Sequence, residues 1–258
     1  FLSRKKAEFG VGIARMEDRY FQTNIIDFSE TKHDESTYSI FGGSIVLEGS
    51  TLNARQFATQ GSREKMAAQI FTGTEHFRSG VSKVTKGTPE PYKKVQSWLQ
   101  VSYQNETYHK VSPKFTLGAY LEAYYSSRNF SNNYTATLMQ AGEFTPTAHS
   151  KVTYNEAFRA NQYAGVGAMP IYQLSESFQL RGEFYGFIPI FPIKKDEYGQ
   201  AYYGKAFTKF EYLGEISLVF QLSFGSISAY VNHYSSPSND WNVGLTLGWQ
   251  LFNSRFVE

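Results

Sequence analysis

The residue types that could do catalytic chemistry are present, but their spacing matches no familiar catalytic arrangement. One large class of serine hydrolases holds its nucleophile in a G-x-S-x-G turn, and the nearest segment here, GGSIV at 42–46, lacks the last glycine. The chain has no cysteine, which removes thiolate nucleophiles, disulfides and cysteine metal ligands together. The histidines show no i, i+4 pair and no H-E-x-x-H spacing. They are His33, His76, His109, His149 and His233. The sequence therefore predicts no catalytic residue, no metal site and no cofactor, and it predicts histidines that are solvated in loops or in a polar interior.

The composition favours a wall between two environments over one dry core. The 258 residues include 22 Phe, 19 Tyr and 3 Trp, yet the mean hydropathy is −0.41. A barrel wall in lipid has this profile because its lipid-facing apolar residues alternate with polar residues that face the interior. No stretch reaches the roughly 18 apolar residues of a membrane-spanning helix. The net charge is only +2, so nucleic acid is not an expected partner.

Alternation of apolar and polar residues predicts about ten strands. Near the end of the chain Val243 and Leu245 alternate with Thr246 and its neighbours, and in an earlier segment Arg181 and Glu183 alternate with apolar residues. The predicted strands cover residues 5–16, 36–49, 63–74, 95–103, 115–123, 162–174, 178–190, 212–222, 226–235 and 241–252. Most have about the 9 to 11 residues that a tilted strand needs to cross a bilayer.

The connections alternate between short turns and long loops, and the longest covers residues 126–161. Outer-membrane barrels have short periplasmic turns and longer extracellular loops, so we expect the two sets at opposite ends. A soluble β-sandwich or a lipocalin-like barrel would show the same alternation with its apolar face inward. However, Arg181, Glu183, Glu211 and Glu215 are too many charges for a dry interior. The expected fold is therefore all-β, a transmembrane antiparallel β-barrel.

Three segments resemble one superfamily, that of the outer-membrane insertase and the two-partner-secretion transporters. The segment at 48–62, EGSTLNARQFATQGS, is similar to a periplasmic turn motif of that superfamily, with Ala58 where proline is expected. The residues that carry this motif are Thr51, Leu52, Asn53, Phe57, Thr59 and Gly61. The second segment, Phe158-Arg159-Ala160-Asn161, stands where the superfamily has Val-Arg-Gly-Phe or Val-Arg-Gly-Tyr on a loop that folds into the lumen. The third is the closing hairpin SFGSISAYVNHY with WNVGLTLGWQLF.

Within this superfamily, residues 132–172 are most similar to the barrel that follows the catalytic domain in patatin-like phospholipases of Bacteroidetes-type bacteria. The resemblance implies a sixteen-stranded barrel, of which residues 1–258 would be the C-terminal portion, with 126–161 as a long infolded lumenal loop. The first six strands and an upstream domain would then be missing. Patatin-like hydrolases use serine with an Asp-Gly pair, and no aspartate here precedes glycine, so this segment is not the lipase itself.

The resemblance implies that Arg159 docks on the inner wall of the barrel. A guanidinium in a partly dehydrated lumen needs a partner, and its planar fork suits a carboxylate. Glu183 is the preferred partner, with Glu211 and Glu215 as alternatives. Ala160 replaces the glycine of the motif and is expected to hinder a tight turn there, because alanine adopts positive φ poorly. The alternative interpretation is that Arg159 is an ordinary loop arginine whose charge is solvated by water.

The leading functional hypothesis is that the barrel anchors an upstream patatin-like phospholipase domain in the outer membrane of a Gram-negative cell and could translocate it. The alternative is an insertase or secretion barrel of the same superfamily, and the third is a passive porin or a structural subunit of an outer-membrane complex. The expected partners are membrane lipid and lipopolysaccharide, the barrel assembly machinery during biogenesis, and subunits of such a complex. Loop lysines could contact lipopolysaccharide phosphate. They are Lys83, Lys86, Lys93 and Lys94.

Overall fold

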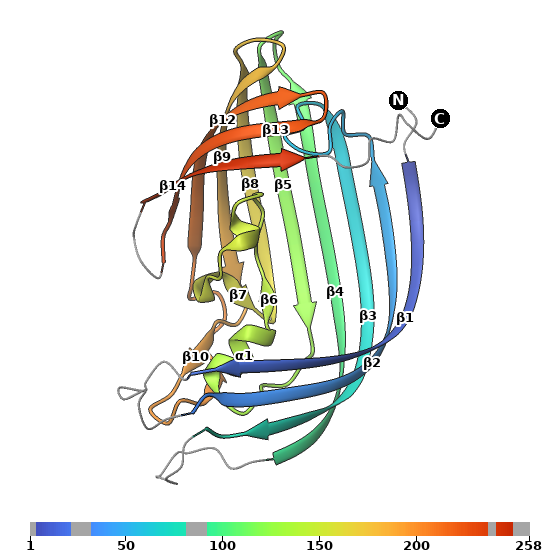
Figure 1. The fold of residues 1–258 in the computed structure, drawn as a ribbon, viewed down its shortest axis with the longest axis vertical. Helices are drawn as coiled ribbons and strands as arrows, with labels where there is room; N and C mark the ends of the chain where they lie inside the picture. The colour runs from blue at the N-terminus through green and yellow to red at the C-terminus, as the bar shows by residue number, and fades with distance from the viewer. Residues whose placement is uncertain (1–3, 22–31, 81–91, 237–240, 250–258) are drawn as a thin grey trace.

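The computed structural model describes residues 4–21, 32–80, 92–236 and 241–249, and Figure 1 shows their fold. The long strands are β1 (Arg4–Tyr20), β2 (Asp34–Ser50), β3 (Gly61–Arg78), β4 (Tyr92–Lys110), β5 (Phe115–Ser126), β8 (Gln162–Gln173), β9 (Phe178–Pro189), β12 (Glu211–Leu222), β13 (Gly225–Tyr234) and β14 (Trp241–Trp249). The shorter elements are α1 (Tyr134–Gln140), β6 (Gly142–Glu143), η1 (Ser150–Val152), η2 (Glu156–Phe158), β7 (Arg159–Ala160), β10 (Ile193–Lys195) and β11 (Ala201–Tyr203). Residues 250–252 of the last predicted strand lie outside the described residues.

The long strands form one antiparallel sheet of ten strands, in the order β1-β2-β3-β4-β5-β8-β9-β12-β13-β14. The all-β antiparallel part of the prediction is therefore confirmed, strand by strand. The first four strands are longer than predicted because their hairpins continue past the last apolar residue; β4, for example, covers Tyr92–Lys110 and not only 95–103. Helix α1 and the short pairs β6–β7 and β10–β11 were not predicted.

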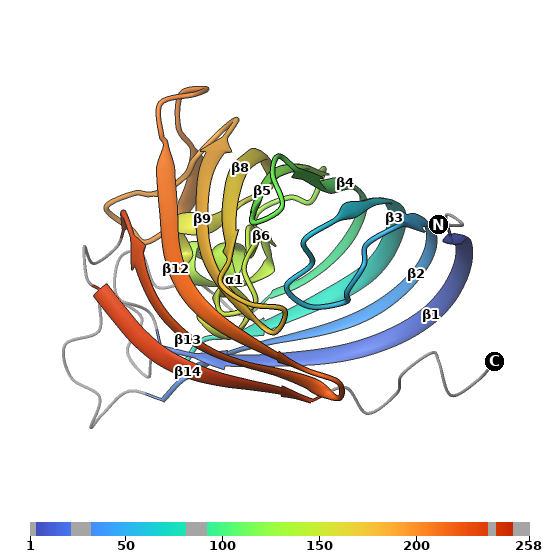
Figure 2. The same cartoon turned by 90° about the horizontal axis from the view of Figure 1, so that it is seen from above.

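The sheet curls around a central axis, with α1 and β6 on its concave side (Figure 2). Strands β1 and β14 are the two edges, and within the described ranges no strand pairs with the outer side of either. We call the two sides of the sheet the concave face and the outward face. No helix in the described parts of the chain is long and apolar enough to cross a membrane.

The predicted alternation decides which side chains lie on each face. Val243 and Leu245 are 82% and 81% exposed on the outward face, whereas Arg181 is 2% exposed on the concave face. Glu183 and Glu215 are buried there too. The predicted division of these residues between two faces is therefore confirmed, and the polar residues line the concave face.

The longest connections lie together at one end of the sheet, as predicted, although the six-residue connection 235–240 belongs to that end too. Four short connections, 51–60, 111–114, 174–177 and 223–224, join strands at one end, which we call the turn end. Residues 127–161 and 190–210 connect strands at the other, the loop end. In Figure 1 the loop end is at the bottom, where α1 and β10 are labelled.

Candidate functional site

Residues 127–161, which we call the inward segment, fold over the concave face of the sheet (Figure 2). Phe144 and Phe158 are buried, and their rings lie 5.5 and 5.6 Å from the ring of Phe187 on β9. Tyr163 and Tyr185 of the sheet pack in the same cluster. The segment is thus fixed by a hydrophobic contact with strands β8 and β9, so its polar groups have defined positions.

A glycine of β8 makes room for this contact. A Cβ atom at Gly165 would lie 2.1 Å from the ring of Phe144, far inside van der Waals contact. Glycine at this strand position therefore allows close approach of another element.

Arg159 holds the inward segment together and does not reach the wall. Its guanidinium lies 2.8 Å from Glu143 and donates to the carbonyl oxygens of Leu138 and Met139 at the end of α1. It also lies 4.6 Å from the centre of the Tyr154 ring. The predicted pairing with Glu183 is therefore wrong. The reason is local: β6 and β7 pair with Glu143 directly opposite Arg159, so the nearest carboxylate belongs to the segment itself.

The rest of the Phe158–Asn161 motif has defined contacts. Ala160 lies in β7 and is fully buried; positive φ among the described non-glycine residues occurs only at Phe57 and Phe207, so the expected strain at Ala160 is absent. Asn161 donates to the hydroxyl of Tyr203, 2.9 Å away, which links the segment to β11.

The three candidate carboxylates have other partners. Glu183 accepts from Arg181 at 3.0 Å and from the Tyr185 hydroxyl at 3.0 Å. Glu211 pairs with Lys209 at 3.3 Å. Glu215 pairs with a histidine of the inward segment, described below. Neither alternative partner therefore contacts Arg159.

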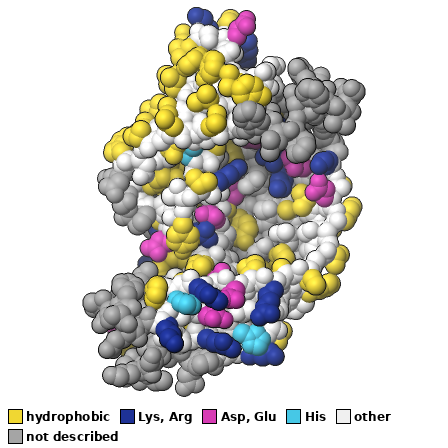
Figure 3. All heavy atoms as spheres, in the orientation of Figure 1, with side chains coloured by type: hydrophobic (Ala, Val, Ile, Leu, Met, Phe, Trp, Pro, Cys, Tyr) yellow, Lys and Arg dark blue, Asp and Glu magenta, His cyan; other side chains and the backbone are white. Residues whose placement is uncertain are grey.

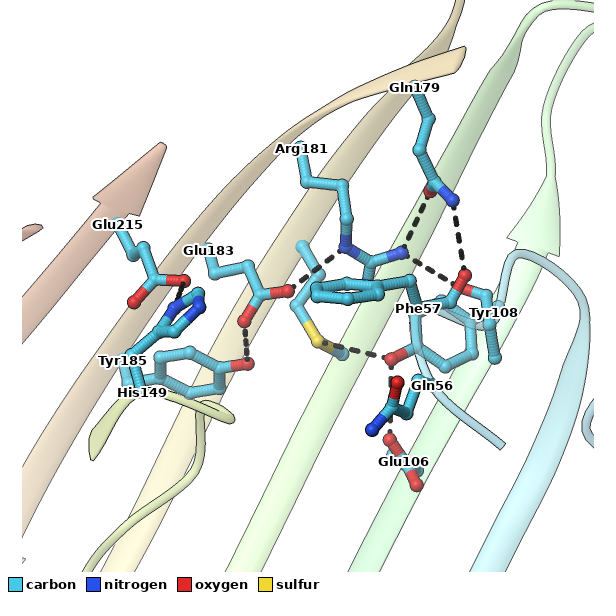
Figure 4. A network of polar contacts seen from close by, with 12 residues as sticks. Gln56, Phe57, Glu106, Tyr108, His149, Gln179, Arg181, Glu183, Tyr185 and Glu215 are labelled. Carbon is cyan, nitrogen blue, oxygen red and sulfur yellow. Dashed lines mark hydrogen bonds and ion pairs between the residues drawn. The ribbon is translucent and has the colours of Figure 1, made fainter. Parts of the chain in front are cut away.

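Arg181 of β9 is the centre of a buried polar network (Figure 4). Besides Glu183, its guanidinium donates to the side chain of Gln179 at 3.1 Å and to the carbonyl of Ala58 at 2.9 Å. The rings of Phe57 and Tyr108 lie 5.6 and 5.7 Å from it. These contacts compensate the buried charge of the guanidinium, and they come from β9, from β4 and from the turn at 51–60.

The predicted turn motif forms the connection between β2 and β3. Asn53 shapes it, because its Oδ1 accepts from the backbone N–H groups of Thr59 and Gln60, each at 3.0 Å. Thr51 closes it by a backbone hydrogen bond to Ser62 and a side-chain oxygen that accepts from the same residue. Gly61 has φ of +95°, and a Cβ there would lie 2.2 Å from the Thr51 carbonyl, so glycine is required.

The tip of this turn reaches across the concave face to distant strands. The Phe57 carbonyl accepts from the side chains of Gln179 and Gln221, and Gln56 accepts from the Ser226 hydroxyl at 2.9 Å. Leu52 packs against the buried cluster. The sequence motif marked the turn correctly but gave no sign that it docks on β9, β12 and β13.

His149 is a contact that the sequence did not reveal. It is 4% exposed, its Nδ1 lies 2.6 Å from Glu215 on β12, and its ring stacks on Tyr230 of β13 with centroids 3.5 Å apart. The interpretation of this histidine as solvated is wrong, because the inward segment buries it against the sheet. Its Nε2 has no hydrogen-bond partner among the described residues.

Arg128 fixes the opposite side of the inward segment. Its guanidinium lies 5.0 and 4.5 Å from the ring centres of Tyr38 and Trp98, and it donates to Gln140 at 2.7 Å. Burial lowers the pKa of this guanidinium, with the neighbouring tyrosines and acids opposing the effect. Gln140 in turn donates to Asp18 of β1. The segment thus spans the concave face from β1 to β13.

These contacts position and bury charged side chains on the concave face of the sheet. In the part of the chain that the structure describes, no group of three or more His, Asp or Glu side chains could hold a metal ion. Comparison with protein-family models, with curated proteins and with solved structures finds no match to this chain.

Proposed function

We propose that this chain is part of a transmembrane β-barrel of a Gram-negative outer membrane, with its outward face in lipid. The first support is the amount of exposed apolar surface. Ile13, Ile70, Phe184 and Leu218 lie on four different strands and are 86%, 64%, 52% and 41% exposed. Water-soluble monomers rarely expose contiguous apolar patches beyond roughly 600 Å².

The observation that carries the proposal is the position of the outward aromatic residues. On β12, Tyr212 and Phe220 lie eight residues apart, with Ile216 and Leu218 between them. At about 3.4 Å per residue this is ~27 Å along the strand, or about 21 Å along the membrane normal for a strand tilted by ~40°. That height is close to the apolar band of an outer-membrane barrel.

The outward aromatic residues of the strands from β5 to β14 form two bands. The loop-end band includes Tyr125, Tyr212 and Trp241, and the turn-end band includes Phe115, Tyr172, Phe178 and Phe220. Within the second band the rings of Phe178 and Phe220 lie 4.9 Å apart. Aromatic girdles at both membrane interfaces are typical of such barrels.

The loop-end band is oblique to the strand register, by the amount that strand tilt requires. Following direct pairs from Trp241 on β14 across five strand steps leads to Ala119 on β5. The band member on β5 is Tyr125, six residues (125 − 119) nearer the loop end. Six residues at about 3.4 Å against five steps at about 4.8 Å give a tilt of ~40°, within the range for closed barrels.

The edges of the sheet also fit this proposal. Unpaired backbone groups of an edge strand are too costly in lipid, so a membrane sheet must close. We propose that β1 and β14 pair with further strands, and that these complete the sixteen-stranded barrel implied by the resemblance.

For the activity, we propose that the barrel anchors an upstream patatin-like hydrolase domain, and that it could pass this domain across the membrane. The resemblance of residues 132–172 supports this assignment. The inward segment and the turn at 51–60 fill the concave side, which favours an anchor over a passive porin. The alternative is an insertase or secretion barrel, favoured by the long unpaired edge that the described part of the chain leaves on β1.

Single-cysteine labelling tests the membrane position, because the chain has no cysteine of its own. Leu180 and Glu176 are both exposed in the structure, the first in the apolar band and the second in a turn. In liposomes we expect a membrane-impermeant maleimide to label Glu176→Cys when it is on the accessible side and to spare Leu180→Cys in either orientation. Equal labelling of the two, in a protein that stays soluble without detergent, would refute the proposal.

Two further measurements separate the activities. An upstream G-x-S-x-G segment with Asp-Gly would support the hydrolase anchor, whereas tandem periplasmic α/β repeats would support the insertase. Single-channel recording tests the porin, because a filled lumen should conduct poorly and a large steady current would contradict the filled lumen.

A further inference from the structure

We infer that a groove on the outward face of β1–β4 binds a membrane lipid that carries more than one phosphate, and this inference rests on the proposed membrane position. The groove has a volume of about 640 Å³. Its lining includes Ile13, Phe41 and Val95, and also Arg15. An apolar groove with a cation at its edge suits a molecule with acyl chains and an anionic head group.

The strand register places the groove on the outward face. Direct pairing aligns Ile13 with Phe41, and Phe41 with Thr72, on one row. The next row towards the loop end consists of Arg15, Ser39, Thr74 and Val95. Both rows point outward by alternation, and the interior side chains Tyr38 and Glu75 are not part of this groove.

The groove exists because small residues interrupt the row of large ones. Ser39 and Thr74 lie between Arg15 and Val95, so the sheet surface is low there while Ile13 and Phe41 project beside it. Ile13 and Phe41 are 86% and 53% exposed, and so would contact hydrocarbon. Acyl chains could therefore lie against them with the head group towards the loop end.

Cations extend from the groove towards the loop end. Beyond Arg15, the next two outward rows contain Lys93, Arg19 and Arg78, with Glu17 and Glu35 among them. Figure 3 shows Lys and Arg side chains gathered over the lower ends of these strands, with His and some acidic groups. Arg15 and the two rows beyond it together contain four cations and two carboxylates, so this surface patch carries a net positive charge.

Three of these cations are available to a ligand. Arg19 is paired with Glu17, but Arg15, Arg78 and Lys93 form no ion pair within the described ranges and are exposed. Arg15 on β1 and Lys93 on β4 are three strand steps apart, about 14 Å at ~4.8 Å per step. Cations spread over this width suit a head group with two or more phosphates, as in diphosphorylated lipid A.

The test uses the whole chain, folded in zwitterionic detergent micelles and titrated with diphosphorylated lipid A, with retained lipid measured by native mass spectrometry. The cation variant carries Arg15→Gln, Arg78→Gln and Lys93→Gln. The matched control carries Arg55→Gln, Lys110→Gln and Lys114→Gln, three exposed cations at the turn end. Each cation near a lipid surface strengthens binding several-fold, so we expect the cation variant to bind at least about tenfold more weakly and the control to match the native chain.

Two further arms identify the ligand. Ser39→Trp fills the groove and should weaken lipid A binding while the cations remain, and monophosphorylated lipid A should bind the native chain more weakly than the diphosphorylated form. Equal binding by the cation variant, or full displacement of lipid A by millimolar inorganic phosphate, would overturn the inference. Heat-modified gel mobility is recorded for every variant. If the native chain shows no heat-modified gel mobility and is soluble in the absence of detergent, the result would instead refute the membrane proposal.

Discussion

Replacing Ile216 by arginine should destabilise the membrane-inserted protein far more than replacing Leu222 by arginine. Both residues lie on the outward face of β12, and both are aliphatic, so the two substitutions differ mainly in position along the strand. Ile216 is 48% exposed, and it lies midway between Tyr212 and Phe220 of the two aromatic bands. In water alone, an arginine at such an exposed position would cost little.

The expected difference in the free energy of unfolding follows from the depth of each residue in the membrane. Ile216 lies four residues from each aromatic band, which is about 14 Å along the strand and ~10 Å along the normal at a tilt of ~40°. Leu222 lies six residues from Ile216 towards the turn end, ~16 Å along the normal at the same tilt, and therefore outside the apolar band. Arginine at the midplane of an outer-membrane barrel costs about 2–4 kcal/mol, falling to about 0–1 kcal/mol near the interface. We therefore expect a difference of about 2–3 kcal/mol.

The assay is reversible urea unfolding from lipid vesicles, followed by tryptophan fluorescence. The free energy of unfolding should depend on urea concentration with the same slope in both variants as in the native chain, because the surface exposed on unfolding is nearly unchanged. The two variants should differ in the urea concentration at the midpoint. A difference below about 0.5 kcal/mol between the two variants would show that β12 does not cross hydrocarbon, and the depth argument would fail.

Three other substitutions test the concave side by the same assay. Arg159→Ala should cost about 1–3 kcal/mol, because it leaves a half-buried carboxylate and two carbonyls without their charged donor; unchanged stability and folding yield would contradict the bracing role. Gly165→Val should displace the ring of Phe144 and destabilise by at least about 1–3 kcal/mol, and Phe144→Ala in the same chain should remove most of this additional cost, whereas additive effects would count against the clash. Arg181→Met should cost about 3–5 kcal/mol since Glu183 stays buried without its cation, and adding Glu183→Leu should recover stability; no recovery would mean that burial of the carboxylate is not the cause.

The sheet could be predicted from the sequence because its signal is local. A period of two assigns each residue of a strand to one of two faces, and Arg181 and Leu180 are separated in this way without any knowledge of their neighbours. The short turns were also predictable, since Asn53 and Gly61 have conformational roles that depend only on nearby backbone.

The interior contacts could not be predicted, because they depend on how an irregular segment folds. Arg159 was assigned to Glu183 by resemblance, but the two-residue pairing of β6 with β7 supplies Glu143 first. His149 has no sequence signal, since its partner Glu215 is 66 residues away and belongs to another element. Strand register across the sheet, which reveals the outward groove, is likewise a property of the fold and not of any short segment.

The docking of the turn at 51–60 has a consequence for assembly. Gln56 and Ser226 are separated by 170 residues, and Phe57 and Gln179 by 122. Closing a loop of more than a hundred residues costs more chain entropy than closing a hairpin, so we expect these contacts to form after the hairpins. The hairpins of the first strands would then form while this turn is still undocked. The turn would dock once β9, β12 and β13 are in place, so its docking marks a complete sheet.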